Sequence, residues 1–141
     1  MKVIQMVVGV IPVTDEDGTK VLSVYRSPLE QHFGGHWFLP GRIIASGEEK
    51  SEIELLTDDF FEEFGVQFGL ETKEKGRGSV FEGHLYGFDY HIIPLRGSLS
   101  SYVFKQKSPS YASIWWKTPF DLNLSVVGHM MGECLRQFKL L

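Results

Sequence analysis

The sequence lacks most of the features that mark a specialised class of protein. It has one cysteine, Cys134, among 141 residues, so it can form neither an internal disulfide nor a cysteine-rich zinc site. The lone cysteine favours a reducing, cytoplasmic compartment. Basic residues are not in excess, because 14 Lys and Arg stand against 18 Asp and Glu for a net charge of −4. Binding to nucleic-acid phosphates needs clustered Lys and Arg, so we expect no nucleic-acid partner.

Long hydrophobic runs are also missing. The longest apolar segment, 3–13, is interrupted by Gln5 and Pro12 and is too short to span a bilayer, so we expect no membrane partner. No signal-peptide cleavage site follows it. Its β-branched residues instead favour a buried strand. The acidic turn 15–18 that comes next is not a calcium loop, because its glycine is not at the sixth position.

What remains is the composition of one globular domain, which we place over residues 1–141. Apolar residues make up 43% of the chain and charged residues 23%. The predicted strands lie at 3–13, 21–25, 37–44, 86–93 and 112–116, and the predicted helices lie at 51–64 and 126–140. Loops are expected at 27–35 and 98–110. Strands, a helix, more strands and a closing helix predict an α+β fold with a mixed sheet.

The segment 51–64 is the clearest helix. Ser51, followed three residues later by Glu54, forms a capping box, and Gly65 is a typical C-terminal cap. The apolar residues at helical spacing are Ile53, Leu56, Phe60 and Phe64. We expect this face of the helix to pack against the sheet.

The same helix is rich in acidic residues. Eight of the 18 acids lie between positions 48 and 63, where Lys50 is the one base. Asp59, Glu62 and Glu63 follow at i, i+3 and i+4, where like charges repel and also oppose the helix dipole. Two interpretations stay open from these residues alone. Three carboxylates projecting together suit a hard cation such as Mg²⁺ or Mn²⁺, and an exposed acidic face is the alternative.

A wider pattern around this helix resembles the Nudix hydrolases. It consists of Trp37-Phe38-Leu39-Pro40-Gly41, then Gly47-Glu48, then Glu62-Glu63-Phe64-Gly65-Val66. The resemblance implies an α/β/α sandwich, a mixed sheet flanked by helices. It also implies a hydrolase that uses Mg²⁺ or Mn²⁺ to split a diphosphate linking a nucleoside to another moiety, with a nucleotide or nucleotide sugar as substrate.

The Nudix box of this sequence is altered. Arg42 stands at the defining glycine, Asp58 and Asp59 replace an Arg-Glu pair, and two extra residues separate Gly41 from Gly65. An insertion of two residues within the helix would rotate its faces by about 200°. The extra residues are therefore expected in the turn 43–50.

The resemblance implies metal-binding and catalytic roles for the helix acids. Glu62 and Glu63 map onto the carboxylates that hold the metal. Asp59 maps onto the preceding glutamate, as a ligand or proton acceptor that is one methylene shorter. The turn glutamate of the box is Glu48 or Glu49, and Glu48 is our fourth candidate metal ligand.

Three residues are candidates for substrate binding. Arg42 suits a diphosphate, since a guanidinium pairs well with phosphate. We also expect Arg42 to lie within salt-bridge reach of the helix acids, replacing the arginine that the box has lost. Arg26 is a second candidate for contact with phosphate. For both arginines, the alternative is a solvated surface residue without a role in binding. Trp37 suits stacking on a base, although aromatic residues in strands are usually core.

The altered box leaves other functions open. One alternative is a catalytically impaired Nudix-fold module that binds a nucleotide or a partner. Another is the GDP-sugar subgroup, which resembles this chain in Trp-Phe-x-Pro-Gly followed closely by Arg. The loop 98–110 contains no acid or histidine, so the general base that some relatives take from it is missing. The sequence also leaves a homodimer open.

Overall fold

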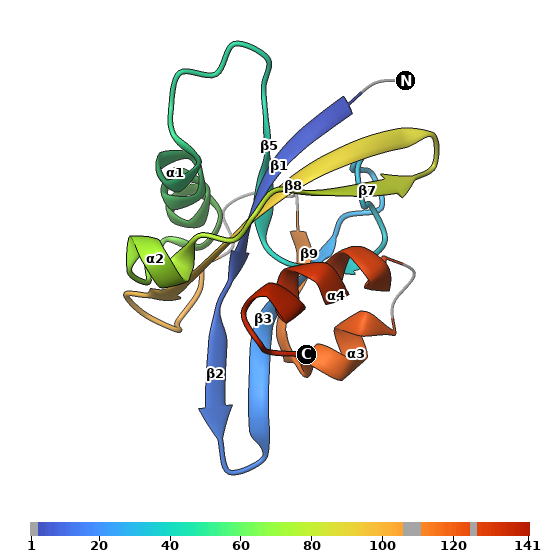
Figure 1. The fold of residues 1–141 in the computed structure, drawn as a ribbon. Helices are drawn as coiled ribbons and strands as arrows, with labels where there is room; N and C mark the ends of the chain where they lie inside the picture. The colour runs from blue at the N-terminus through green and yellow to red at the C-terminus, as the bar shows by residue number, and fades with distance from the viewer. Residues whose placement is uncertain (1–2, 106–110, 125–126) are drawn as a thin grey trace.

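The computed structural model describes residues 3–105, 111–124 and 127–141, which form two β-sheets flanked by helices (Figure 1). The first sheet contains β1 (Val3–Val10), β5 (Gly41–Ile44), β6 (Phe68–Leu70), β7 (Phe81–Leu85) and β8 (Phe88–Leu99). The second contains β2 (Pro12–Asp15), β3 (Gly18–Arg26), β4 (Trp37–Phe38) and β9 (Tyr111–Lys117). The helices are α1 (Glu52–Phe64), α2 (Lys73–Gly76), α3 (Pro119–Asn123) and α4 (Gly128–Gln137).

The first sheet is mixed, which confirms the predicted fold class. β1 pairs in parallel with β8 and antiparallel with β5, so that Val7 lies between Ile93 and Arg42. Because side chains alternate along a strand, β1 serves two cores. Its residue Val7, like Ile11 directly after the strand, belongs to the core beneath α1. Its even-numbered residues 4–10 belong to the core beneath α4.

The helix α1 forms as its sequence predicts. The Ser51 hydroxyl accepts a hydrogen bond from the Glu54 amide (3.2 Å) and donates one to the Glu54 carboxylate (3.1 Å). Gly65 ends the helix in the left-handed conformation (φ 71°). Leu56, Phe60 and Phe64 are fully buried, while Ile53 packs at the margin of the same core. The predicted apolar face is therefore confirmed.

Gly9 marks the point where α1 rests on β1. A Cβ atom at this position would lie 3.0 Å from Cε2 of Phe60 and 3.4 Å from Cδ2 of Leu56. Such a contact with the ring is closer than side chains normally tolerate. The missing side chain thus lets the helix lie directly on the strand.

The predicted strand 37–44 is wrong in one respect, because it is two strands in different sheets. β4 ends at Phe38 and β5 begins at Gly41. Pro40 has no N–H to donate to a ladder, and its carbonyl instead accepts from the Gly9 amide (2.7 Å). The predicted strand 3–13 is divided similarly at Ile11, where the chain leaves the first sheet for the second.

The later elements keep their predicted type with different limits. Tyr86 and Gly87 form a hairpin turn with positive φ (48° and 81°), so the strand predicted over 86–93 begins at Phe88 and continues to Leu99. The closing helix begins at Gly128 and ends at Gln137. Residue 126 and the 106–110 part of the predicted polar loop lie outside the described residues.

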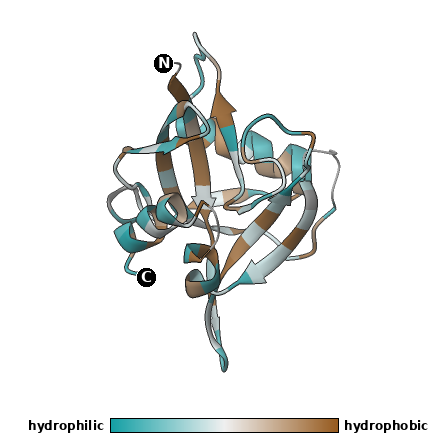
Figure 2. Ribbon diagram, turned by 90° about the vertical axis from the view of Figure 1, so that its right-hand side faces the viewer, coloured by the Kyte–Doolittle hydropathy of each residue, from teal (hydrophilic) through white to brown (hydrophobic). Residues whose placement is uncertain are grey.

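Hydropathy follows this arrangement. Figure 2 shows apolar residues along the strands that pack against the helices, and polar residues in the turns. Among the described residues, no helix is long and apolar enough to cross a membrane.

Candidate functional site

Asp59 lies on the inner side of α1, where it is only 7% exposed. Helical spacing places it on the flank of the apolar face, so its burial was not predicted. Burial is the main cause that raises its pKa to about 7, and repulsion from Glu63 adds to the shift. Arg42 and Arg26 oppose the shift through their positive charges. Among the described residues, the buried Oδ2 of Asp59 has no hydrogen-bond partner.

Arg26 ends β3 and brings a buried positive charge to the same region. Its side chain is 7% exposed, and its Nε and Nη1 have no hydrogen-bond partner in the described part of the chain. Its Cζ atom lies 5.5 Å from the ring centroid of Tyr111. The pairing of β3 with β9 shifts register at this point, so that Arg26 lies opposite Tyr111. A buried guanidinium with unsatisfied donors is suited to an anion.

Tyr111 connects the elements around these charges. Its hydroxyl donates to the Gly41 carbonyl (2.9 Å) and accepts from the Gly41 amide (3.4 Å). Its ring stacks on Phe64 of α1, with centroids 5.4 Å apart and planes 9° from parallel. Burial raises the pKa of the phenol well above its usual value, so Tyr111 is neutral. The sequence did not predict this connection.

Arg42 confirms its predicted contact with the acidic helix. Its Nη1 lies 3.8 Å from Oε2 of Glu62, with both side chains substantially exposed. An exposed pair of this kind contributes little to stability. Asp58 points to another base, since its carboxylate lies 2.7 Å from Nζ of Lys50. Of the helix acids, Glu62 is therefore the one for which the structure records an ion pair with Arg42.

The remaining predicted site residues lie in three different surroundings. Glu63 follows Asp59 by one helical turn and lies close enough to raise its pKa. Glu48 lies in the β5–α1 loop, where Oε1 accepts from the Lys50 amide (3.0 Å). Trp37 is partly buried in β4, with Nζ of Lys117 4.4 Å from its ring centroid. One face of the indole is thus already covered by a cation.

The predicted ligands do not converge on a single point. In the part of the chain that the structure describes, no three His, Cys, Asp or Glu side chains are arranged to hold a metal ion. The structure brings Asp59 and Glu63 together, places Glu62 against Arg42, and puts Glu48 in the loop before α1.

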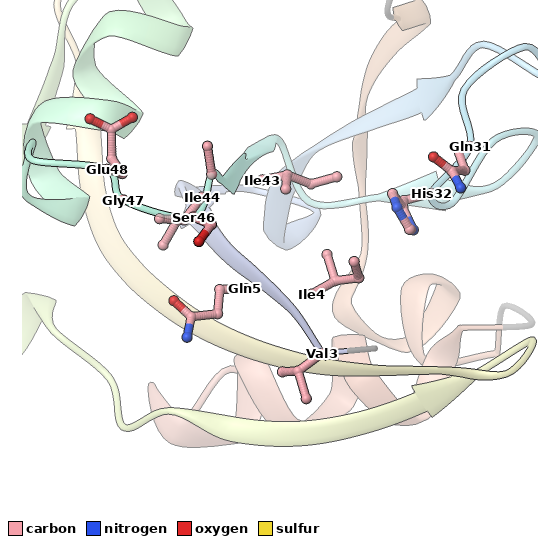
Figure 3. A pocket seen from close by; sticks show the side chains of 11 residues that line it. Val3, Ile4, Gln5, Gln31, His32, Ile43, Ile44, Ser46, Gly47 and Glu48 are labelled. Atoms are coloured by element: carbon pink, nitrogen blue, oxygen red, sulfur yellow. The ribbon is translucent and has the colours of Figure 1, made fainter. Parts of the chain in front are cut away.

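A cavity of about 690 Å³ opens beside the β5–α1 loop (Figure 3). Its lining residues are Val3, Ile4, Gln5, Gln31, His32, Ile43, Ile44, Ala45, Ser46, Gly47 and Glu48. Apart from Glu48, the sequence pointed to none of its polar side chains as site residues. The sequence signal that could have pointed to this cavity was the pair of extra residues expected in the turn 43–50.

Solved structures with the same architecture cover nearly the whole chain. The MutT protein from Methanosarcina mazei Go1 superposes with a TM-score of 0.74 at 19% identity, over 98% of this chain and 96% of that one. A Nudix hydrolase from Nitrosomonas europaea gives 0.71 at 18% identity, over 97% and 88%. The chain has the Nudix fold. The Nudix domain of Shewanella oneidensis NrtR, solved with ADP-ribose, gives 0.68 at 17% identity over 97% and 86%.

The sequence itself matches no protein-family model and no curated protein. The likeness to the Nudix fold therefore rests on architecture. The segment that resembles the Nudix box spans β5, the loop after it and α1, which are the elements that carry Arg42, Glu48 and Asp59.

Proposed function

We propose that the protein is a divalent-metal-dependent hydrolase that splits the diphosphate linkage of a nucleotide or nucleotide sugar. One observation carries the proposal. Asp59 and Arg26 are buried with polar atoms that find no partner among the described residues, and they lie close enough for Arg26 to influence the pKa of Asp59. A buried acid that lacks a cation, beside a buried base that lacks an anion, suits a metal–diphosphate ligand.

The donor set fits Mg²⁺ or Mn²⁺ bound with some of its own water. Mg²⁺ usually keeps several waters and takes only one or two protein carboxylates, so three converging ligands are not required. Asp59 and Glu63 are the first candidates, because their mutual repulsion raises the pKa of Asp59. Glu62 and Glu48 remain proposed ligands at the periphery. When bound, the cation would neutralise phosphate charge and orient water.

The residues of this chain have distinct roles in the proposed reaction. Arg26 and Arg42 bind the phosphate oxygens. Asp59 accepts a proton from the attacking water at Oδ2, the oxygen that has no hydrogen-bond partner among the described residues. The water oxygen bonds to phosphorus, the bond from phosphorus to the bridging oxygen breaks, and the leaving phosphate takes up a proton.

The nucleotide class of the substrate is supported by what similar structures bind or act on. NrtR was solved with ADP-ribose, and other similar structures are an Ap4A hydrolase from C. elegans and a UDP-X diphosphatase. A binding module without catalysis is the second candidate. The ion pair between Arg42 and Glu62 favours the binding module, because Glu62, a proposed metal ligand, is already paired with Arg42.

The test is a hydrolysis screen of ADP-ribose, nucleotide sugars and Ap4A with Mg²⁺ and Mn²⁺, measured as release of the products. Asp59→Asn should lower kcat by about 100-fold or more, the usual effect of losing an acid–base group. Asp58→Asn is the matched control, since Asp58 pairs with Lys50 and should leave the rate nearly unchanged. Nucleotide binding without any hydrolysis would establish the binding module instead.

A further inference from the structure

We propose that a hollow on the other face of the first sheet from Arg42 binds a second ligand, a small phosphate compound that carries two or more negative charges. The hollow has a volume of about 350 Å³ and lies where α2, β8 and the turn after α4 meet (Figure 1). Its lining residues are Glu71, Lys75, Arg96, Gln137, Phe138 and Lys139. Small-molecule sites typically have volumes of about 300–1,000 Å³, so the hollow suits a compact ligand.

The charge of the lining points to an anion. Among the described lining residues, the bases are Lys75, Arg96 and Lys139, and the one acid is Glu71. They carry an excess of positive charge in a chain whose net charge is −4. Lys75 and Lys139 are exposed, and neither forms an ion pair within residues 3–105, 111–124 and 127–141. Bases gathered without acids of their own suit a ligand that carries several negative charges.

Arg96 is the lining residue best suited to a phosphate group, because its side chain is held on two sides. Its Nε lies 2.9 Å from Oε2 of Glu71, and its Nη1 donates to the Phe138 carbonyl (3.3 Å). In the part of the chain that the structure describes, its Nη2 has no hydrogen-bond partner. A guanidinium that is already fixed loses less conformational entropy when it pairs with a phosphate oxygen.

Lys139 occupies a backbone position that favours glycine. Its φ is 57°, its amide donates to the Arg136 carbonyl (3.0 Å), and the Leu140 amide donates to the Leu135 carbonyl (2.9 Å). Glycine usually closes a helix end of this kind. These bonds, with the one from Arg96, also occupy carbonyl oxygens that would otherwise repel an anion. A positive charge thus stands where glycine would suit the backbone better.

The hollow is separate from the proposed diphosphate site. In the pairing of β1 with β8, Arg96 lies opposite Val10, which belongs to the core beneath α4. In the pairing of β1 with β5, Arg42 lies opposite Val7, which belongs to the core beneath α1. Paired residues project from the same face of a sheet, so Arg96 and Arg42 lie on opposite faces. A phosphate compound in the hollow is therefore a second ligand and not a part of the substrate.

The experiment titrates inorganic phosphate and pyrophosphate into protein that a chelating resin has freed of metal. Binding is followed by NMR through the backbone amide resonances at constant ionic strength, with sodium chloride as the reference. We expect saturable shifts at Lys75 and Lys139, and tighter binding of pyrophosphate because it carries more negative charge. Phosphate bound at Arg26 and Arg42 would shift other resonances, so one titration distinguishes the two sites.

Three substitutions separate the effect of charge from that of folding. Lys139→Gly removes the ammonium group but suits the positive φ, so it should weaken binding by about fivefold without loss of stability. Lys75→Gln should weaken binding by a similar factor. Glu71→Gln keeps the shape of the side chain and removes the opposing charge, so it should strengthen binding by about fivefold. Lys20→Gln, on the β2–β3 hairpin outside the hollow, is the matched control for net charge.

The second site is supported by saturable shifts at Lys75 and Lys139 whose affinity falls in Lys139→Gly and rises in Glu71→Gln. It is overturned if no binding saturates, if the shifts are confined to the surroundings of Arg26 and Arg42, or if Lys20→Gln changes the affinity as much as Lys139→Gly does. The result is independent of hydrolysis. An inactive protein can bind phosphate in this hollow, and an active hydrolase can lack the second site.

Discussion

The hydroxyl oxygen of Tyr111 lies 2.9 Å from the carbonyl oxygen of Gly41, and so joins the first residue of β9 to the first residue of β5. The two residues are 70 positions apart in the sequence. Arg42 follows Gly41 directly, and Arg26 lies over the Tyr111 ring. A single side chain thus supports both arginines that we assign to phosphate.

Replacing this hydroxyl should weaken the protein and the reaction together. Tyr111→Phe keeps the stacking on Phe64 but leaves the buried Gly41 carbonyl without its donor, at a cost of about 1–3 kcal/mol in the free energy of unfolding. We expect KM to rise more than kcat falls, because phosphate contacts are displaced. Denaturant unfolding and steady-state kinetics measure both effects. Tyr102→Phe, at an exposed tyrosine, is the control, and an unchanged unfolding midpoint would contradict the prediction.

Asp59 should make the metal-free protein less stable as pH rises. Its pKa is about 7 in the folded state against 3.8 for a free carboxyl, so the folded state holds the proton more tightly. This contribution is full below pH 3.8, falls as pH rises, and is lost above pH 7. The difference is on the order of 4 kcal/mol.

Denaturant titrations in EDTA at pH 5 and pH 8 measure this dependence. Asp59→Asn should reduce the difference between the two pH values and should be more stable than the parent at pH 8. Asp58→Asn, which changes an exposed carboxylate one residue away, should keep it. If the free energy of unfolding changes equally between pH 5 and pH 8 in the parent and in Asp59→Asn, Asp59 is already ionised at pH 5 and the prediction is wrong.

Divalent cations should stabilise the fold. Mn²⁺ or Mg²⁺ at millimolar concentration should raise Tm, because a ligand that binds only the folded state stabilises it by mass action. Glu62→Gln with Glu63→Gln should abolish the rise. Without metal, Glu62→Gln alone should change the free energy of unfolding little, since the exposed pair of Glu62 with Arg42 contributes little. Glu16→Gln, in the β2–β3 turn, is the control, and an unchanged Tm in the parent would contradict metal binding.

Replacing Arg26 by lysine should impair hydrolysis. Arg26→Lys keeps the charge but loses the planar fork that pairs with two phosphate oxygens. We expect kcat/KM to fall by about 10- to 100-fold, as for the loss of a hydrogen bond to a charged group. The same substitution at Arg77, which pairs with Glu52 at the start of α1, should have little effect. Equal rates for parent and Arg26→Lys would remove Arg26 from the site.

Local chemistry explains which elements the sequence predicted correctly. Ser51 and Gly65 define the ends of α1 because capping depends on neighbouring residues alone. The salt bridge of Arg42 was predictable from a substitution pattern within the box. The division at Pro40 was harder to predict, because it depends on a hydrogen bond from Gly9, more than thirty residues earlier.

The buried charges could not be predicted by the same means. Helical periodicity gives the direction in which Asp59 projects, but not how closely β3 and β9 approach that flank. The contact of Tyr111 with Gly41 and the position of Gln5 in the cavity join segments that are distant in sequence. Such positions are fixed by the way the two sheets and α1 pack together.

Gly9 gives the site a further dependence that none of its charged residues reveals. The ring of Phe60 lies where a side chain at position 9 would project, so a hydrogen atom sets how deeply α1 sits on the sheet. Asp59 precedes Phe60 and moves with it. A methyl group at position 9 would push the helix outward, admit water to the carboxylate and lower the pKa of Asp59 toward that of an ordinary surface acid. The pKa of the proposed proton acceptor thus depends on the distance between α1 and β1 at Gly9.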